Sequence, residues 1–141
     1  MLSIATARAL REAGLTWKPA QLDFFAIPDR GLDERTFVIN DLPASTADLL
    51  GEAIITFDGA VEWALDYVPS GEVLWLPTED QLRERLAAEL AGEPDFNLTL
   101  TSAGGVHRCE TRFRGEVLAA EAADAADAYG AVLLFVMRAG E

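Results

Sequence analysis

Histidine and cysteine are the side chains most often used for catalysis and metal binding near neutral pH, and this chain of 141 residues has one of each. His107 and Cys109 are two residues apart in an expected strand, so both point to the same face. They project in parallel rather than toward each other, which argues against a nucleophilic pair. A metal ion would need two further ligands from elsewhere in the fold. We therefore expect a small buried cysteine and a half-exposed histidine, with no metal site and no catalytic residues.

The densest group of polar residues is the loop Pro28–Arg35, which lies between two expected strands. Loops on a rigid sheet often carry binding residues. In a binding role, Arg30 would hold an anion, and Asp29 or Asp33 would accept hydrogen bonds. The alternative is a hairpin loop with local turn hydrogen bonds and a surface ion pair. The loop supplies four binding candidates, Asp29, Arg30, Asp33 and Arg35.

The large aromatic residues gather in the first 76 residues, and core packing accounts for most of them. Trp17 follows the first expected helix and is adjacent to Lys18 and Pro19. We expect this tryptophan to be exposed. Because amphipathic aromatic side chains are enriched at recognition sites, Trp17 is the fifth binding candidate.

Charge restricts the choice of partner. The chain has 24 acidic and 11 basic residues and a net charge of −13, and no basic surface suited to nucleic acid is visible. The acidic residues serve solubility, or they attract a basic partner or imitate DNA. Two alternatives to a binding protein therefore stay open. One is an acidic DNA mimic that inhibits a DNA-binding protein. The other is a carboxylate-dependent hydrolase, with or without Mg²⁺, that uses Asp29, Asp33, Asp41 and Asp58.

Cellular location is indicated by three features. A lone cysteine excludes an internal disulfide, which agrees with a reducing compartment. The N-terminus lacks the pattern of a signal peptide. The apolar run Ala131–Met137 is shorter than the roughly 20 residues that span a bilayer. We expect a cytoplasmic protein with no membrane insertion and no cofactor.

Three helices are predicted. Ser3 can cap a helix over Ile4–Ala13, and Thr78 with Gln81 forms a capping box for a helix over Glu79–Ala91. A third helix is expected to start within 121–124, and Gly130 in its middle predicts close approach to another backbone.

Strands are predicted between the helices. The Asp58-Gly59 pair predicts a two-residue hairpin turn in which Thr56 faces Val61 and Ile54 faces Trp63. The segment 40–51 is expected to be a connection, partly helical over 46–50. A meander with turns near Gly104-Gly105 and Arg114-Gly115 follows the second helix. The expected strands are Phe24–Ile27, Thr36–Ile39, Ala53–Phe57, Ala60–Leu65, Val73–Leu76, Phe96–Thr101, Val106–Phe113 and Glu116–Ala119.

A series of short sequence blocks resembles a group of small, uncharacterised bacterial proteins, some of which carry a pilus-assembly label. The blocks are Ala9–Leu15, Trp17–Pro19, Phe25–Arg30, Phe37–Ile39 and Leu74–Leu82, and the likeness covers roughly residues 9–90. The C-terminal strands and helix resemble small sandwich modules of phage-related proteins. The resemblance implies a bacterial cytosolic protein of unassigned role.

These features together predict an α+β fold. We expect a mainly antiparallel sheet flanked by two helices, followed by a β-meander and a C-terminal helix. The expected subdomains are 1–92 and 93–141, packed as one unit. The favoured function is a non-enzymatic cytosolic binding or adaptor protein, whose partner is a protein or a second copy of the chain. Its expected contact surface is the sheet with the Asp29–Arg35 loop.

Overall fold

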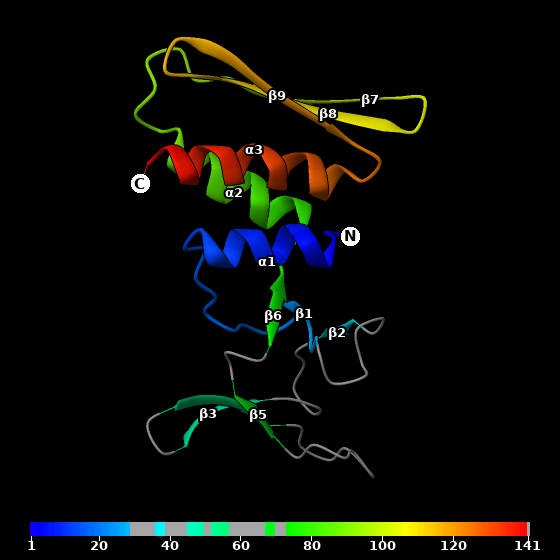
Figure 1. The fold of residues 1–141 in the computed structure, drawn as a ribbon, viewed down its shortest axis with the longest axis vertical. Coiled ribbons are helices and arrows are strands. Elements are labelled where there is room, and N and C mark those ends of the chain that lie inside the picture. The colour runs from blue at the N-terminus through cyan, green and yellow to red at the C-terminus, as the bar shows by residue number, and fades with distance from the viewer. Residues whose placement is uncertain (29–35, 39–44, 50–51, 57–66, 70–72, 141) are drawn as a thin grey trace. The chain divides into compact units, whose positions relative to one another are not determined.

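The computed structural model describes residues 1–28, 36–38, 45–49, 52–56, 67–69 and 73–140. The α+β class is confirmed, since groups of antiparallel strands lie between three helices in the part of the chain that the structure describes (Figure 1). In order, the elements are α1 (Ile4–Glu12), β1 (Phe24–Ala26), β2 (Phe37–Val38), β3 (Ser45–Leu49), β4 (Glu52–Thr56), β5 (Tyr67–Pro69), β6 (Leu74–Leu76), α2 (Glu79–Glu89), β7 (Leu98–Ala103), β8 (Val106–Phe113), β9 (Glu116–Ala122) and α3 (Ala125–Ala139).

The chain divides into two compact units, which differ from the expected subdomains 1–92 and 93–141. One unit combines Met1–Leu15 with Pro77–Glu141, and the other is Thr16–Leu76. The reason is that α1 and α2 both pack against α3, so the two helices expected to flank the first sheet belong with the meander. Their fully buried leucines, Leu10 of α1 and Leu82 and Leu86 of α2, lie in the core of this unit.

Local signals fix the starts of α1 and α2 as predicted, whereas α1 ends at Glu12 and α2 at Glu89, one and two residues before the predicted ends. The Ser3 hydroxyl accepts a hydrogen bond from the Thr6 amide at 3.2 Å. At the start of α2, the Gln81 amide donates to Thr78 Oγ1 at 3.3 Å, and the Thr78 amide donates to Gln81 Oε1 at 2.9 Å. This reciprocal pair is the expected capping box.

Helix α3 leaves no room for a side chain at Gly130. A Cβ atom added at Gly130 would lie 2.8 Å from the Cγ2 atom of Thr6 and 3.0 Å from the Cδ1 atom of Leu2. Gly130 is therefore closely packed, but the prediction of close approach to another backbone is not confirmed, because the nearest atoms belong to side chains of α1 and of the residues before it. The helix itself begins after Asp124, whose carboxylate accepts a hydrogen bond from the Ala126 amide at 2.9 Å.

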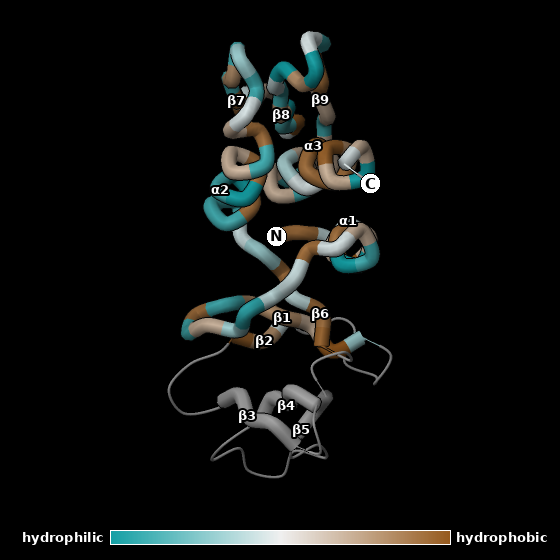
Figure 2. The backbone as a smooth tube through the Cα atoms, turned by 90° about the vertical axis from the view of Figure 1, so that its left-hand side faces the viewer, coloured by the Kyte–Doolittle hydropathy of each residue, from teal (hydrophilic) through white to brown (hydrophobic). Residues whose placement is uncertain are grey.

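The meander β7–β8–β9 covers α3. Strand β8 lies between the other two, both pairings are antiparallel, and α3 packs against β8 and β9 (Figure 2). Cys109 and Thr111 of β8 are fully buried, so the face of the sheet that they occupy is the inner one. Both turns fall where the sequence predicted them, between Ala103 and Val106 and between Phe113 and Glu116.

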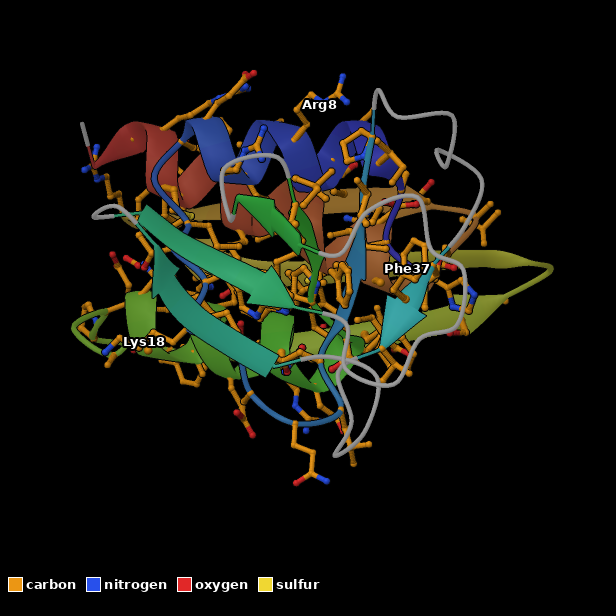
Figure 3. All side chains as sticks on the ribbon, turned by 90° about the horizontal axis from the view of Figure 1, so that it is seen from below. Arg8, Lys18 and Phe37 are labelled. Carbon is orange, nitrogen blue, oxygen red and sulfur yellow. The ribbon has the colours of Figure 1, made fainter. Side chains whose placement is uncertain are left out.

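The Thr16–Leu76 unit contains two further antiparallel sheets, ordered β2-β1-β6 and β3-β4-β5. In the first, Phe25 pairs with Phe37 on one side and with Trp75 on the other. Phe25 and Ile27 are almost completely buried, and the ring of Phe37, labelled in Figure 3, stacks on the Phe25 ring with the centroids 5.4 Å apart.

The second sheet corrects two predictions. The helix expected within 46–50 is wrong, because Ser45–Leu49 is a strand paired with β4. The expected facing of Thr56 with Val61 and of Ile54 with Trp63 is also wrong. Both edges of β4 are already paired, with Thr56 between Ser45 and Tyr67. Neighbouring strands decide these pairings, and they override weak local preferences. The predicted strand Ala60–Leu65 and the Asp58-Gly59 turn lie outside the described residues.

In the described part of the chain, no helix is both long enough and apolar enough to cross a membrane.

Candidate functional site

Trp17 belongs to an aromatic cluster of the Thr16–Leu76 unit and is half-buried, so the expectation that it is exposed is wrong. Its ring stacks on Trp75, with centroids 6.4 Å apart and an interplanar angle of 7°, and lies 5.9 Å from the Phe25 ring. The indole N–H donates to Asp23 Oδ2 at 2.8 Å. Buried polar groups need such partners, and Asp23 is only 5% exposed. Trp17 therefore has a clear packing role.

Among the described residues of this cluster, Trp75 has a buried polar atom without a hydrogen-bond partner. Its Nε1 atom is buried and has no hydrogen-bond partner among the residues that the structure describes. Sequence reasoning missed this atom, because burial of one indole nitrogen depends on neighbours distant in the chain. The ring itself is partly exposed and packs against Trp17.

The remaining sequence-based binding candidates, Asp29, Arg30, Asp33 and Arg35, lie outside the described residues. The same holds for Asp41 and Asp58, the other two carboxylates of the hydrolase alternative.

His107 and Cys109 occupy the positions expected for them, on the inner face of β8. Cys109 is fully buried, and this burial raises the pKa of its thiol to about 11. His107 is half-buried, and its Nδ1 atom lies 2.6 Å from the Ser102 hydroxyl. Within the described ranges, His, Cys, Asp and Glu side chains form no group of three that could hold a metal ion.

A different feature emerges at β7, the strand at one edge of the meander. Gly104 and Gly105 have φ angles of +59° and +79°, which are typical of a two-residue type I′ turn. Such a turn closes on a hydrogen-bonded pair, here Ala103 with Val106. In antiparallel strands, hydrogen-bonded and non-hydrogen-bonded pairs alternate. Thr99 and Thr101 therefore direct their backbone groups to β8.

The other residues of β7 direct their backbone N–H and C=O groups away from β8. These residues are Leu98, Leu100 and Ser102, and their outward backbone groups are called here the β7 edge. In the part of the chain that the structure describes, β7 pairs only with β8, so no described strand occupies this edge. The β7 edge is thus a row of backbone donors and acceptors available for one more strand.

The side chains of β7 are all uncharged. The strand reads LTLTSA, with Leu98 and Leu100 half-buried on the inner face and Thr99 and Thr101 exposed on the outer face. Natural sheets usually protect an edge with charged residues, proline or a bulge, and β7 has none of these. The opposite edge differs, because β9 carries Glu116 and Glu121.

The centre of the outer face holds the charges that β7 lacks. The Arg108 guanidinium donates to Glu110 at 3.0 Å and to Glu121 at 3.3 Å. These hydrogen bonds raise the pKa of Arg108, and the bond to Glu110 has the larger effect. Arg108 therefore links β8 to β9 and leaves β7 as the uncharged side of the sheet.

Comparison of the chain with protein-family models, curated proteins and solved structures found no match. The resemblance to small bacterial proteins noted for residues 9–90 gains no support from these comparisons.

The sequence contains a signal for the β7 edge. Leucine and threonine alternate in a chain that is one quarter charged, and the run is followed by Gly104-Gly105. This pattern predicts a strand and a tight turn, and both are observed. Which side of the strand stays unpaired became visible only from the order of the three strands.

Proposed function

We propose that this protein is a non-enzymatic binding or adaptor protein that holds a protein partner by strand addition at the β7 edge. In this mode of recognition, an extended segment of the partner forms main-chain hydrogen bonds with the edge, and its alternate side chains provide specificity. The observation that carries the proposal is the row of outward backbone groups on Leu98, Leu100 and Ser102 in a strand without any charged residue.

The side chains of β7 indicate which segments would fit. A partner strand would continue the inner face beside Leu98 and Leu100, so it should carry apolar residues there. On the outer face it would meet Thr99 and Thr101, which suit small or hydroxyl-bearing residues. We therefore propose that the preferred partner is an uncharged, alternating strand. The proposed location is the cytoplasm, which agrees with a lone and buried cysteine.

The proposal can be tested with random extended peptides displayed on phage, selected against the protein at low concentration. Selected peptides should be uncharged and alternating, and should lose affinity for the variant Thr99→Lys/Thr101→Lys. The matched control is Val117→Lys/Ala119→Lys, which places two lysines on the outer face of the other edge strand. The control matches the variant in the residues that face the new lysines on β8. Thr99 and Ala119 both face Glu110, and Thr101 and Val117 each face an arginine.

Peptides that bind the β7 variant as tightly as they bind the unmodified protein would contradict the proposal. Salt provides a second criterion. Main-chain hydrogen bonding and apolar contact should tolerate a rise in ionic strength, whereas binding through the acidic surface should weaken steeply.

A further inference from the structure

We infer that the strand bound at the β7 edge is β7 of a second copy of this chain, paired antiparallel about a twofold axis. The inference rests on the proposed function and names its partner. It would join two meanders into one six-stranded sheet, in which each former edge strand becomes central. A twofold interface of this kind needs one surface that is complementary to itself, and an edge strand can meet that condition.

Charge favours this position for self-association. Each copy carries a net charge of −13, so two copies repel each other wherever acidic surfaces meet. β7 offers an edge with no charged side chain at all. The edge of β9 is less suitable, because Glu121 lies among the residues that direct backbone groups outward there, and Glu116 begins the strand.

The hydrogen-bond pattern selects the register. A twofold axis normal to the sheet places the inner faces of the two copies on the same side. Because residues that face each other in antiparallel strands have side chains on the same side, one residue of β7 must then face the same residue of the second copy. With the axis at Leu100, Leu100 faces its own copy and Leu98 faces Ser102 of the second copy. All outward backbone groups of the β7 edge are then used, in three pairs that exchange two hydrogen bonds each. Moving the axis to Thr99 or Thr101 leaves only two such pairs within the strand.

The side chains agree with the axis at Leu100. On the inner face, the half-buried Leu100 side chains of the two copies would meet and shield each other from water. On the outer face, Thr99 would lie opposite Thr101 of the second copy, a pairing of uncharged β-branched residues that suits a sheet. With the axis at Thr101, Leu100 would instead face Ser102.

The expected dimer is weak. Five residues from each strand bury less surface than the roughly 1,200 Å² of a small stable interface, so association should occur at micromolar to millimolar concentration. Because repulsion between the two acidic copies opposes it, added salt should strengthen the dimer or leave it unchanged. This salt response is opposite to that of association driven by charge attraction.

Sedimentation velocity of the full chain over a range of concentrations tests the inference. We expect a concentration-dependent monomer–dimer equilibrium in the unmodified protein. In Thr99→Lys/Thr101→Lys, lysines face each other across the interface, and the dissociation constant should rise about tenfold or more. In Thr99→Lys/Thr101→Glu, each lysine faces a glutamate of the second copy, and dimerisation should return. The control Val117→Lys/Ala119→Lys should dimerise like the unmodified protein.

Thermal melting of each variant confirms that it is folded. If the double-lysine variant unfolds, amide exchange of the unmodified protein at low and high concentration serves in its place, because Leu98, Leu100 and Ser102 should gain protection only on dimerisation. An unmodified protein that stays monomeric, or a dimer that Thr99→Lys/Thr101→Lys leaves intact, would overturn the inference. A Thr99→Lys/Thr101→Glu variant as weak as the double-lysine variant would overturn the register. If the chain stays monomeric and selected peptides still bind the β7 edge, only the second copy is excluded and the proposed function stands.

Discussion

Replacing Gly130 with alanine should destabilise the helical unit, although alanine is the better helix former. In a helix interior the exchange is worth about 1 kcal/mol in favour of alanine. The added methyl group would lie 2.8 Å from Thr6 Cγ2, closer than real Cβ atoms come to other atoms, and 3.0 Å from Leu2 Cδ1, which is tighter than most real contacts. Overpacking of this kind costs about 1–3 kcal/mol. The balance predicts a loss of roughly 0–2 kcal/mol in the free energy of unfolding for Gly130→Ala.

A second substitution separates the two contributions. Thr6→Ser removes the Cγ2 methyl group and keeps a hydroxyl near Ser3, whose own hydroxyl donates to Thr6 Oγ1 at 2.9 Å. In the double variant the Thr6 Cγ2 methyl group is absent, so Gly130→Ala should become neutral or stabilising by up to about 1 kcal/mol. The coupling energy between the two sites should be roughly 1–3 kcal/mol, because Thr6→Ser relieves the overpacking.

Urea denaturation followed by far-ultraviolet circular dichroism measures these values. The three described helices all belong to the unit that contains Gly130, so the helical signal reports on that unit. A gain of about 1 kcal/mol for Gly130→Ala alone, with no coupling to Thr6→Ser, would refute the close approach of α1 and α3.

Four further predictions concern packing, capping and burial in the described residues. Leu86→Ala should lower the free energy of unfolding by about 2–5 kcal/mol through a core cavity. Thr78→Ala should lower it by about 1 kcal/mol through loss of the helix cap. A variant as stable as the unmodified protein in urea would contradict the prediction for that residue. Trp17→Phe should cost about 1–3 kcal/mol, because the buried Asp23 loses a donor, and an unchanged unfolding midpoint would show that this hydrogen bond is unimportant. The Cys109 thiol should resist alkylation at neutral pH until the protein unfolds. Burial raises the pKa of Cys109 to about 11, so the folded protein keeps the thiol protonated at pH values where the unfolded chain, with a thiol pKa of about 8.5, loses the proton. The contribution of the protonated thiol to stability is therefore complete below pH about 8.5 and is lost as the pH rises toward 11. Stoichiometric labelling of the folded protein would contradict this.

The features that could be predicted from the sequence are those decided by neighbouring residues. The capping box of Thr78 and Gln81 needs only a hydroxyl and an amide three positions apart. The turn at Gly104-Gly105 needs two residues that tolerate positive φ. Even the close packing at Gly130 could be expected, because an interior glycine weakens a helix unless its missing side chain serves packing.

What could not be predicted depends on residues far apart in the chain. Strand β4 pairs with β3 and β5, and no local feature of Thr56 indicates Ser45 and Tyr67 as its neighbours. The half-buried state of Trp17 results from Trp75, which is 58 positions away in the sequence. The grouping of α1 with α3 and the unpaired side of β7 likewise follow from the assembled fold.

The central claim is that the β7 edge pairs with a strand of a second copy. Residue-resolved amide hydrogen exchange, measured on dilute and concentrated samples, tests it most directly. The amides of Thr99 and Thr101 point toward β8 and are hydrogen-bonded within the sheet, so they should be protected at both concentrations. The amides of Leu98, Leu100 and Ser102 should exchange rapidly in the dilute sample and become protected in the concentrated one. Rapid exchange of these three amides at every concentration would contradict the claim.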